Sequence, residues 1–286
     1  MKKTKYFLQA IIVFFLFLIF KIIGLKYSRL ISSKIITKFG PHFRSKEIIK
    51  KNLSFAYKNL DEDEINRIIK NVWASYGKIF AEYVFIKKFR IQKNNSEIRI
   101  KGQNFLEDIK KMKEPVIFIS GHFDNFELMA MKIEQAGIDL TAIYRPLNNI
   151  FLNPIMENIR VKYICKKQIK KGLAGTKQIL KNFKCGSSIA LMIDQRVSQG
   201  IKTKFFSKEA LTTTIPAQFV KKFKCKIVPI YIERDNKNKF NIEIFEPKVF
   251  PENETVETIT LNLNKILEKM LLRNPSQWIW THDRWK

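Results

Sequence analysis

Short apolar runs alternate with amphipathic stretches along residues 115–272. Buried strands are expected at 115–120, 140–145, 188–193, 226–233 and 240–246. The stretches between and after them have helical spacing, and we expect these helices at 125–137, 149–163, 173–184, 215–223 and 255–272. Such alternation is typical of parallel strands covered by helices on both faces. The sequence therefore predicts an α/β fold whose mostly parallel central sheet is flanked by helices.

A helical region precedes the α/β part. Asp61 is expected to cap a helix, with Glu64 as the reciprocal cap, and apolar residues then recur at helical spacing to about residue 87. Residues 42–60 are predicted to form a short helix and a connection, and residues 92–104 are a polar stretch.

The N-terminal segment from Tyr6 to Leu25 is almost entirely apolar. Gln9 and Lys21 are its strongly polar interruptions, and twenty residues are about enough to cross the hydrocarbon layer. No small-residue cleavage site follows, so we expect a retained membrane anchor, most simply a transmembrane helix, rather than a signal peptide. A helix lying in the interface, with Lys21 reaching toward water, remains an open alternative.

Basic residues flank the anchor on both sides, and their distribution slightly favours a cytoplasmic body. Because no repeat or low-complexity linker divides the rest, we predict an anchor over 1–30 and a single domain over 31–286. That domain is expected to be helical over 42–90 and α/β over 100–286.

The body of the chain is strongly basic. The whole chain has 53 Lys and Arg against 26 Asp and Glu, and without residues 1–30 a net charge of +21 remains. Such a charge attracts nucleic acid, an anionic membrane face, or an acidic protein or lipid. No helix-turn-helix, zinc-finger or RNA-binding pattern accompanies it, so nucleic acid is not the expected partner.

The stretch GHFDNFE follows the first predicted strand at residues 121–127. In an open α/β sheet, ligands gather where strands end and helices begin. Asp124 or Asn125 is the expected cap of the next helix. Glu127, one turn beyond His122, is expected to hold one imidazole nitrogen so that the other can take a proton from a hydroxyl. An HxxxxE pattern alone also fits a surface histidine beside an ordinary first-turn glutamate.

The same stretch resembles a known sequence block. It is similar to the GHxxNWE-like block of the bacterial lipid A biosynthesis acyltransferases (lauroyl and myristoyl transferases), within the glycerolipid acyltransferase superfamily. Gly121, His122, Asn125 and Glu127 match, and Phe126 replaces the usual Trp.

Further blocks extend the resemblance over about residues 100–286. They are YRP at 144–146, Asn153-Pro154 followed by Arg160, KNFKCGSSIALMIDQR at 181–196, KFFSKEALTTTIPAQF at 204–219 with Ser207 where Gly is common, and NPSQWIWTHDRWK at 274–286. Several ordered blocks are far more specific than a histidine and a glutamate alone.

The resemblance implies transfer of an acyl chain from acyl carrier protein to a hydroxyl of an anionic glycolipid, a lipid A precursor of lipopolysaccharide biosynthesis. It places the reaction at the cytoplasmic face of the inner membrane, with no cofactor and no metal. His122 would be the general base and Glu127 its orienter. Arg160 and Asp194 match active-site positions of the family, and Asn125 and Arg145 are expected to contact substrate.

Alternatives remain for several of these residues. Arg160 suits a phosphate or a developing oxyanion but equally a solvated helix surface, and Asp194 could be a structural hydrogen-bond acceptor. His282 is expected to pack or hydrogen-bond within the C-terminal block. Acylation of another glycolipid or a lysophospholipid, or hydrolysis of a lipid, are the competing reactions. The absence of a GxSxG elbow argues against a covalent acyl-enzyme.

Overall fold

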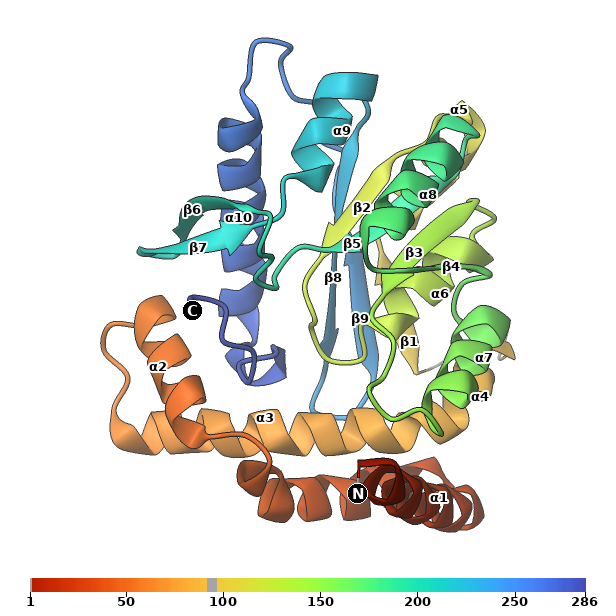
Figure 1. The fold of residues 1–286 in the computed structure, drawn as a ribbon, viewed down its shortest axis with the longest axis vertical. Coiled ribbons are helices and arrows are strands. Elements are labelled where there is room, and N and C mark those ends of the chain that lie inside the picture. Colours follow the sequence, from red (N-terminus) through yellow and green to blue (C-terminus); the bar gives the residue numbers. More distant parts are fainter. Residues whose placement is uncertain (1, 92–96) are drawn as a thin grey trace.

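A computed structural model describes residues 2–91 and 97–286. The predicted polar stretch at 92–104 therefore lies partly outside the described residues. The central sheet has seven strands in the order β1-β9-β8-β2-β5-β3-β4 (Figure 1). The strands are β1 Ile98–Lys101, β2 Ile117–Ser120, β3 Leu140–Tyr144, β4 Lys167–Lys170, β5 Ser188–Met192, β8 Ile227–Arg234 and β9 Phe240–Ile244.

The sheet is mostly parallel, as the sequence predicts. Strands β4, β3, β5, β2 and β8 run in one direction, and the pair β9 and β1 runs in the other, because β8 and β9 are joined by a short turn and pair antiparallel. Strand β2 lies in the middle and is entirely buried. The loop that leaves it therefore starts from the most rigid part of the sheet.

Helices cover both faces of the sheet. On one face lie α8 (Leu173–Lys184) and α9 (Ile215–Phe223), and the rings of Phe183 and Phe219 pack edge to face with centroids 5.2 Å apart. A right-handed crossover from β2 to β3 places α6 (Glu127–Gln135) on the other face, behind the sheet in Figure 1. The remaining helices of this part are α5 (Gln103–Met112), α7 (Asn153–Tyr163) and α10 (Val256–Arg273).

Four strands were missed by sequence patterning: β1, β4 and the two strands of the separate antiparallel hairpin, β6 (Ile201–Phe205) and β7 (Lys208–Thr212). Each is short and has at least one exposed lysine or arginine. Charged residues are common on strands at sheet edges, where they discourage further pairing, and they hide the apolar pattern of a strand.

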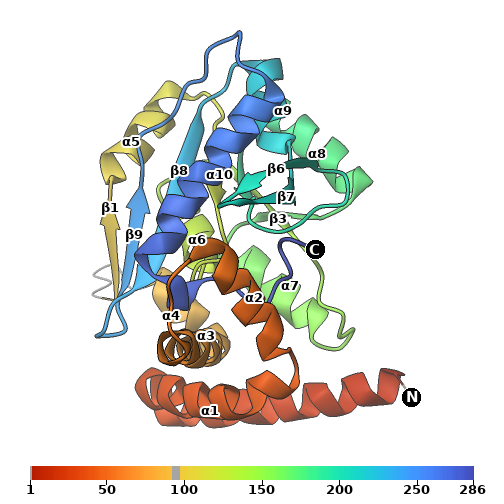
Figure 2. The same cartoon turned by 90° about the vertical axis from the view of Figure 1, so that its left-hand side faces the viewer.

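The helical region lies beneath one end of the sheet (Figure 2). It consists of α1 (Lys2–Phe39), α2 (Lys46–Ala56), α3 (Glu62–Glu82) and α4 (Ile86–Ile91). The predicted capping box is present, because Asp61 accepts from the Glu64 amide and the Glu64 carboxylate accepts from the Asp61 amide. Helix α3 ends at Glu82, earlier than expected.

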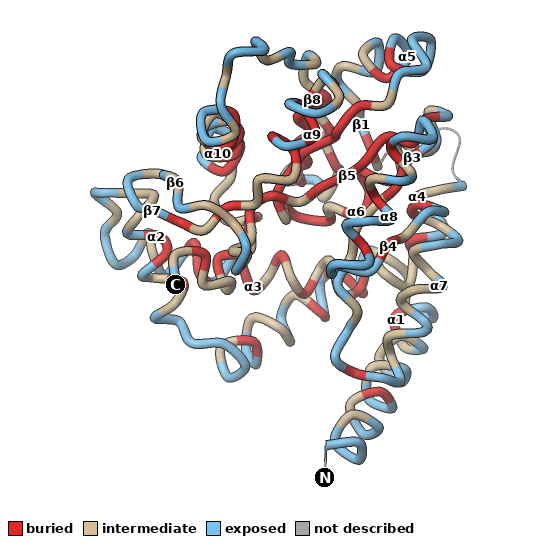
Figure 3. Tube along the Cα trace, turned by 45° about the horizontal axis from the view of Figure 1, so that its top comes forward, coloured by how far each residue is buried: buried red, intermediate tan, exposed pale blue. Residues whose placement is uncertain are grey.

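Helices α1 and α3 are in close contact. A Cβ on Gly77 would lie 2.5 Å from the carbonyl oxygen of Ser32, and the Ser32 hydroxyl donates to the Gly77 carbonyl. Only glycine permits this approach of the two backbones. Burial concentrates in the central strands and the helix faces that cover them, whereas α1 is mostly exposed along its N-terminal part (Figure 3).

Candidate active site

Two neighbouring strands bring distant residues together at one edge of the sheet. Strands β2 and β5 pair in parallel, with Ser120 opposite Met192. His122 follows β2 by two residues, and Asp194 follows β5 by two residues. Because the carboxyl ends of parallel strands meet at the same edge, the two side chains emerge next to each other.

Asp194 holds the imidazole of His122. Its Oδ1 lies 2.8 Å from His122 Nδ1, and its Oδ2 accepts the backbone N–H of His122 at 2.7 Å. The Asp194 carboxylate is buried, whereas the His122 side chain is 19% exposed. If Nδ1 donates its proton to Asp194, Nε2 is the nitrogen left to accept one.

The surroundings keep Asp194 ionised and in place. Burial alone would raise its pKa, but the charge and hydrogen bonds of His122 and the indole N–H of Trp278, 2.9 Å from Oδ2, outweigh burial and hold the pKa below its ordinary value. A Cβ on Gly121 would lie 3.1 Å from Asp194 Oδ2 and 2.9 Å from the Phe123 ring. The glycine of the motif therefore gives the carboxylate its close approach.

Glu127 makes different contacts from those expected. Its Oε1 accepts from Arg160 Nε at 2.8 Å, from Arg160 Nη2 at 2.5 Å and from the Tyr83 hydroxyl at 2.7 Å. No hydrogen bond joins Glu127 to His122 among the contacts of the described residues. The predicted imidazole–carboxylate pair exists, but its carboxylate comes from Asp194, because β5 is the neighbour of β2 and brings Asp194 to Nδ1.

Arg160 lies beside the motif. It reaches Glu127 from α7 and stacks over the Tyr144 ring, 5.6 Å from its centroid. Burial tends to lower the pKa of the guanidinium, but the charge of Glu127 more than compensates and raises it. The pair is thus a fixed cation and anion next to His122.

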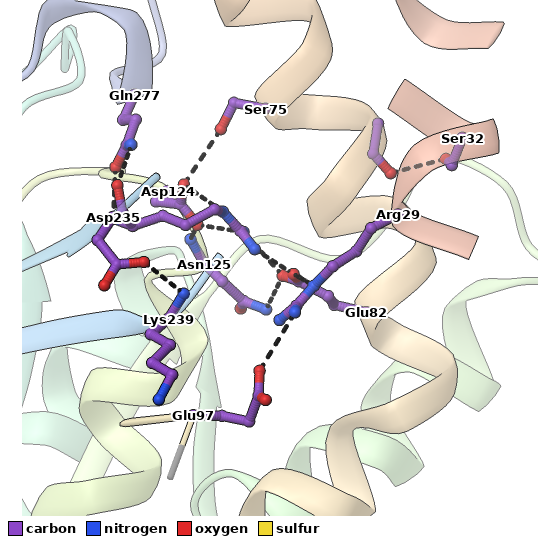
Figure 4. A network of polar contacts seen from close by, with 12 residues as sticks. Arg29, Ser32, Ser75, Glu82, Glu97, Asp124, Asn125, Asp235, Lys239 and Gln277 are labelled. Atoms are coloured by element: carbon purple, nitrogen blue, oxygen red, sulfur yellow. Dashed lines mark hydrogen bonds and ion pairs between the residues drawn. The ribbon is translucent and has the colours of Figure 1, made fainter. Parts of the chain in front are cut away.

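The second half of the motif enters a buried charge cluster, which we define as Arg29, Glu82, Asp124 and Arg234 (Figure 4). Arg234, at the end of β8, makes ion pairs with both Glu82 and Asp124. Arg29 of α1 donates to Glu82 at 2.6 Å. The cluster therefore joins the N-terminal helix, α3, β8 and the loop that carries His122.

Asp124 is held in an uncommon backbone conformation, with φ at 36°. Its carboxylate is occupied by Arg234 and by the Ser75 hydroxyl. The expectation that Asp124 or Asn125 caps α6 is therefore wrong, since the residue at that position is Phe126, without a side-chain cap. The Asp124 carboxylate is bound within the charge cluster and is therefore not available to cap α6.

Asn125 also points into the charge cluster. It is 1% exposed, and its Nδ2 donates to Glu82 Oε2 at 2.9 Å. Asn125 does not belong to the described residues that line the cavity beside His122. The structure thus places this side chain beneath the loop instead of on the side where substrate contact was expected.

A cavity of about 470 Å³ opens beside His122. Apolar residues of α6, β3, α8, β5 and α9, and Ile164 at the end of α7, line it: Ala130, Ala142, Ile143, Ile164, Ile179, Ala190, Leu191 and Ile215. Basic side chains also line it: Arg44, Arg145, Arg160, Lys171 and Arg196. This combination suits a ligand with a hydrocarbon chain and a negatively charged group.

His282 lines the same cavity. Its Nε2 accepts the backbone N–H of Arg196 at 3.0 Å, and its carbonyl accepts from Asn52. Burial lowers the pKa of His282, which keeps the ring neutral near pH 7. Within the C-terminal block, the backbone N–H of His282 donates to the carbonyl of Ile279 at 3.1 Å, whereas the ring bonds Arg196 outside that block.

Cofactor and metal ligands were sought among the same residues. No group of three or more His, Cys, Asp or Glu side chains within 2–91 and 97–286 could hold a metal ion. A second hollow, of about 770 Å³ between α5 and α6, is lined by apolar residues together with Arg, Lys, Gln and Glu, without a histidine or cysteine among its described residues.

The whole chain, residues 1–286, matches the model of the bacterial lipid A biosynthesis acyltransferases. The chain belongs to this family. It is 22% identical over 249 residues to the lipid A biosynthesis lauroyltransferase of Escherichia coli K12, covering 85% of this chain and 79% of that protein. It is 22% identical over 253 residues to the lipid A biosynthesis acyltransferase of Haemophilus influenzae, covering 85% and 78%. It is also 21% identical over 248 residues to the lipid A biosynthesis palmitoleoyltransferase of Escherichia coli K12, covering 85% and 79%.

Family membership makes this chain an acyltransferase. Its long apolar N-terminal helix fits a membrane anchor. Among the described residues, this is the one helix that is long and apolar enough to cross a bilayer.

Sequence reasoning did not find Glu82, Arg234 or Trp278. The signal for Arg234 was present, because an arginine closing an otherwise apolar strand must find a carboxylate partner if it is buried. The partner itself depends on tertiary contacts.

Proposed function

We propose that this chain is a membrane-bound O-acyltransferase that moves a fatty acyl chain from acyl carrier protein to a hydroxyl of a lipid A precursor. The reaction takes place at the cytoplasmic face of the inner membrane, in a domain formed by residues 31–286. The observation that carries the proposal is the His122–Asp194 pair at the wall of a cavity that is lined by both apolar and basic side chains.

His122 acts as the general base in this mechanism. Its neutral ring donates from Nδ1 to Asp194 and takes the proton of the acceptor hydroxyl on Nε2. The alcohol oxygen then forms a bond to the thioester carbonyl carbon. When the tetrahedral intermediate collapses, the carbon–sulfur bond breaks and the departing thiolate takes the proton back from the imidazolium. Asp194 stabilises the imidazolium in between.

Glu127 and Arg160 supply a fixed charge pair beside the base. In this proposal Glu127 positions Arg160, and Arg160 faces a phosphate of the acceptor or the developing oxyanion. Arg145 contributes to the same basic lining of the cavity. Asn125 and Asp124 support the loop from the buried side.

The basic body serves both substrates. Acyl carrier proteins are acidic and lipid A precursors are phosphorylated, so complementary charge favours the encounter with each. The printed names of the relatives, a lauroyltransferase and a palmitoleoyltransferase of lipid A biosynthesis, support a fatty acyl chain as the transferred group.

An acceptor panel tests the proposal. Membranes that contain the full chain are incubated with radiolabelled acyl–acyl carrier protein and with a lipid A precursor, another glycolipid or a lysophospholipid, with His122→Ala as the control. We expect label on the lipid A precursor with the wild type only. Acyl-coenzyme A in a parallel reaction tests the donor. Label on another acceptor alone would overturn the proposed substrate, and label released solely as free fatty acid would identify a hydrolase.

A further inference from the structure

Helix α1 consists of two arms. Gly24 has φ of 77° and ψ of 168°, which breaks the helix into an N-terminal arm (residues 2–23) and a second arm (residues 25–39). In Figures 1 and 2 both arms run across the bottom of the molecule, beneath α3, and the N-terminus stays at that level.

The N-terminal arm contacts the body near both of its ends. Close to its start, Asn149 Nδ2 donates to the carbonyl of Tyr6 at 2.9 Å. Close to its end, the rings of Phe17 and Phe20 pack against Phe80 of α3, with centroids 5.1 and 6.2 Å away. The arm therefore lies along the body over most of its length.

The burial pattern of the N-terminal arm agrees with these contacts. Its buried and half-buried side chains are Tyr6, Gln9, Ala10, Val13, Leu16, Phe17, Ile19, Phe20 and Ile23, and all but Ile19 recur at helical spacing. From Tyr6 to Phe20 this stripe covers 15 residues, a rise of about 21 Å along the helix. Exposed apolar side chains occupy the rest of the surface: Phe7, Leu8, Ile11, Ile12, Phe14, Phe15, Leu18 and Ile22.

A helix with these contacts cannot easily cross the bilayer. The hydrocarbon layer is about 30 Å thick, so a spanning arm would carry the part of α3 that packs against it into the hydrocarbon, together with the polar groups of α3. A helix in the membrane plane keeps one side on the protein and the opposite side in lipid. Only the exposed stripe then enters the hydrocarbon boundary.

The second arm has the composition of an interfacial helix. Its exposed positions combine apolar or aromatic side chains, Tyr27, Leu30, Ile31 and Phe39, with Lys26, Lys34 and Lys38. Such a mixture binds the boundary between headgroups and acyl chains, and the lysines favour anionic lipids.

The loop before α7 continues this surface. Leu147, Ile150 and Phe151 are exposed, and the Phe151 ring contacts Phe7 edge to face at 5.5 Å. The loop follows Arg145, which lines the cavity beside His122. The apolar surface thus reaches the edge of the candidate active site.

We propose that α1 is a monotopic anchor: both arms lie in the plane of an anionic phospholipid bilayer, together with the 147–151 loop, on one leaflet. We call the exposed side chains of these three segments the base surface. The N-terminus then stays on the same side of the membrane as the body, and the cavity opens close to the level at which a lipid acceptor resides. This inference concerns the anchor alone and does not depend on the acyl group or acceptor.

Depth measurements test the orientation. In the full chain with Cys185→Ser and Cys225→Ser, and with the buried Cys165 retained, a single nitroxide is attached at Leu8→Cys, Phe15→Cys or Ile22→Cys. These exposed positions are seven residues apart and share one helix face. In vesicles of phosphatidylethanolamine and phosphatidylglycerol, accessibility to oxygen and to a nickel chelate gives the depth of each label.

For an in-plane arm we expect the three labels at one depth, about 5–10 Å below the headgroups, and a label at Ile150→Cys in lipid as well. A label at Lys177→Cys on α8 is the water-exposed control. A spanning helix instead places Leu8 and Ile22 about 20 Å apart along the membrane normal. That result, or labels shielded by association of two copies, would overturn the proposal.

The side of the membrane provides an independent readout. A membrane-impermeant maleimide is added to inside-out vesicles or to intact cells that contain Thr4→Cys, Lys26→Cys or Lys177→Cys in the same background. We expect all three to react in the same preparation and none in the other. Reaction of Thr4→Cys and Lys177→Cys from opposite sides of the membrane would exclude the monotopic anchor. This result can occur while acyl transfer is intact, so failure of this inference is distinct from failure of the proposed function.

Discussion

Two groups of charged side chains flank the loop between β2 and α6, and they differ in access to solvent. The first is the pair of His122 and Asp194, in which the ring is partly exposed in the cavity. The second is the charge cluster of Arg29, Glu82, Asp124 and Arg234, in which each residue is at most 6% exposed. One loop of a few residues thus contributes to a reactive site and to a buried support.

The two groups use their charges in different ways. In the first group, the imidazole is partly exposed to the cavity, while the carboxylate is fixed by burial and by Trp278. In the second, every carboxylate oxygen of Glu82 and Asp124 has a donor, so neither group can exchange a proton without breaking an ion pair. The following predictions test whether chemistry and support are divided in this way.

The largest effect is expected for His122→Ala. Removal of the base should lower acyl transfer by roughly 10²- to 10⁴-fold or more. The unfolding midpoint, followed by circular dichroism in detergent, should stay near that of the wild type, because His122 is not part of the charge cluster. Wild-type transfer rates in this variant would exclude His122 as the base.

Arg234→Met should instead reduce stability. It leaves Glu82 and Asp124 buried with fewer partners, which costs about 3–5 kcal/mol of unfolding free energy. The matched control is Arg273→Met, because Arg273 pairs with Glu233 and Glu243 at the surface and its loss costs about 1 kcal/mol or less. Chemical denaturation in detergent measures both. Equal effects of the two variants would contradict the supporting role of the charge cluster.

Asp194→Asn and Glu127→Gln distinguish the two carboxylates near His122. Loss of the negative charge beside Nδ1 disfavours the imidazolium, so Asp194→Asn should reduce kcat by about 10²-fold or more and move the rising limb of the pH–rate profile to lower pH.

Glu127→Gln frees Arg160 and should raise KM for the acceptor more than it lowers kcat, without a shift of that limb. The pH dependence of kcat/KM for both variants provides the measurement. A shift in Glu127→Gln and none in Asp194→Asn would return the role of orienter to Glu127.

The smallest effect concerns acid stability. Burial would raise the pKa of Glu82, but Arg234 and Arg29 outweigh it and lower the pKa. A lowered folded-state pKa contributes stability above the unfolded-state value, near 4, and the contribution disappears as pH falls through the folded-state value. We therefore expect the free energy of unfolding to fall as the pH is lowered from 5 to 3, and to fall less in Arg234→Met. The same acid dependence in both proteins would argue against Arg234 as the cause.

Sequence patterning predicted much of this fold and part of the site. The periodicity around GHFDNFE gave β2 and α6, and Asp61 with Glu64 gave the start of α3. The charged edge strands β1 and β4 and the hairpin of β6 and β7 were not predicted, because their apolar residues are few and are interrupted by charged residues.

The sequence by itself determined the alternation of strands and helices, the apolar N-terminal helix and the position of His122 at the end of a buried strand. It did not determine which carboxylate holds the imidazole. Glu127 is five residues away along the chain and Asp194 is 72, but strand order makes β5 the neighbour of β2. Proximity at the edge of a parallel sheet depends on which strands pair, and that is decided by long-range packing.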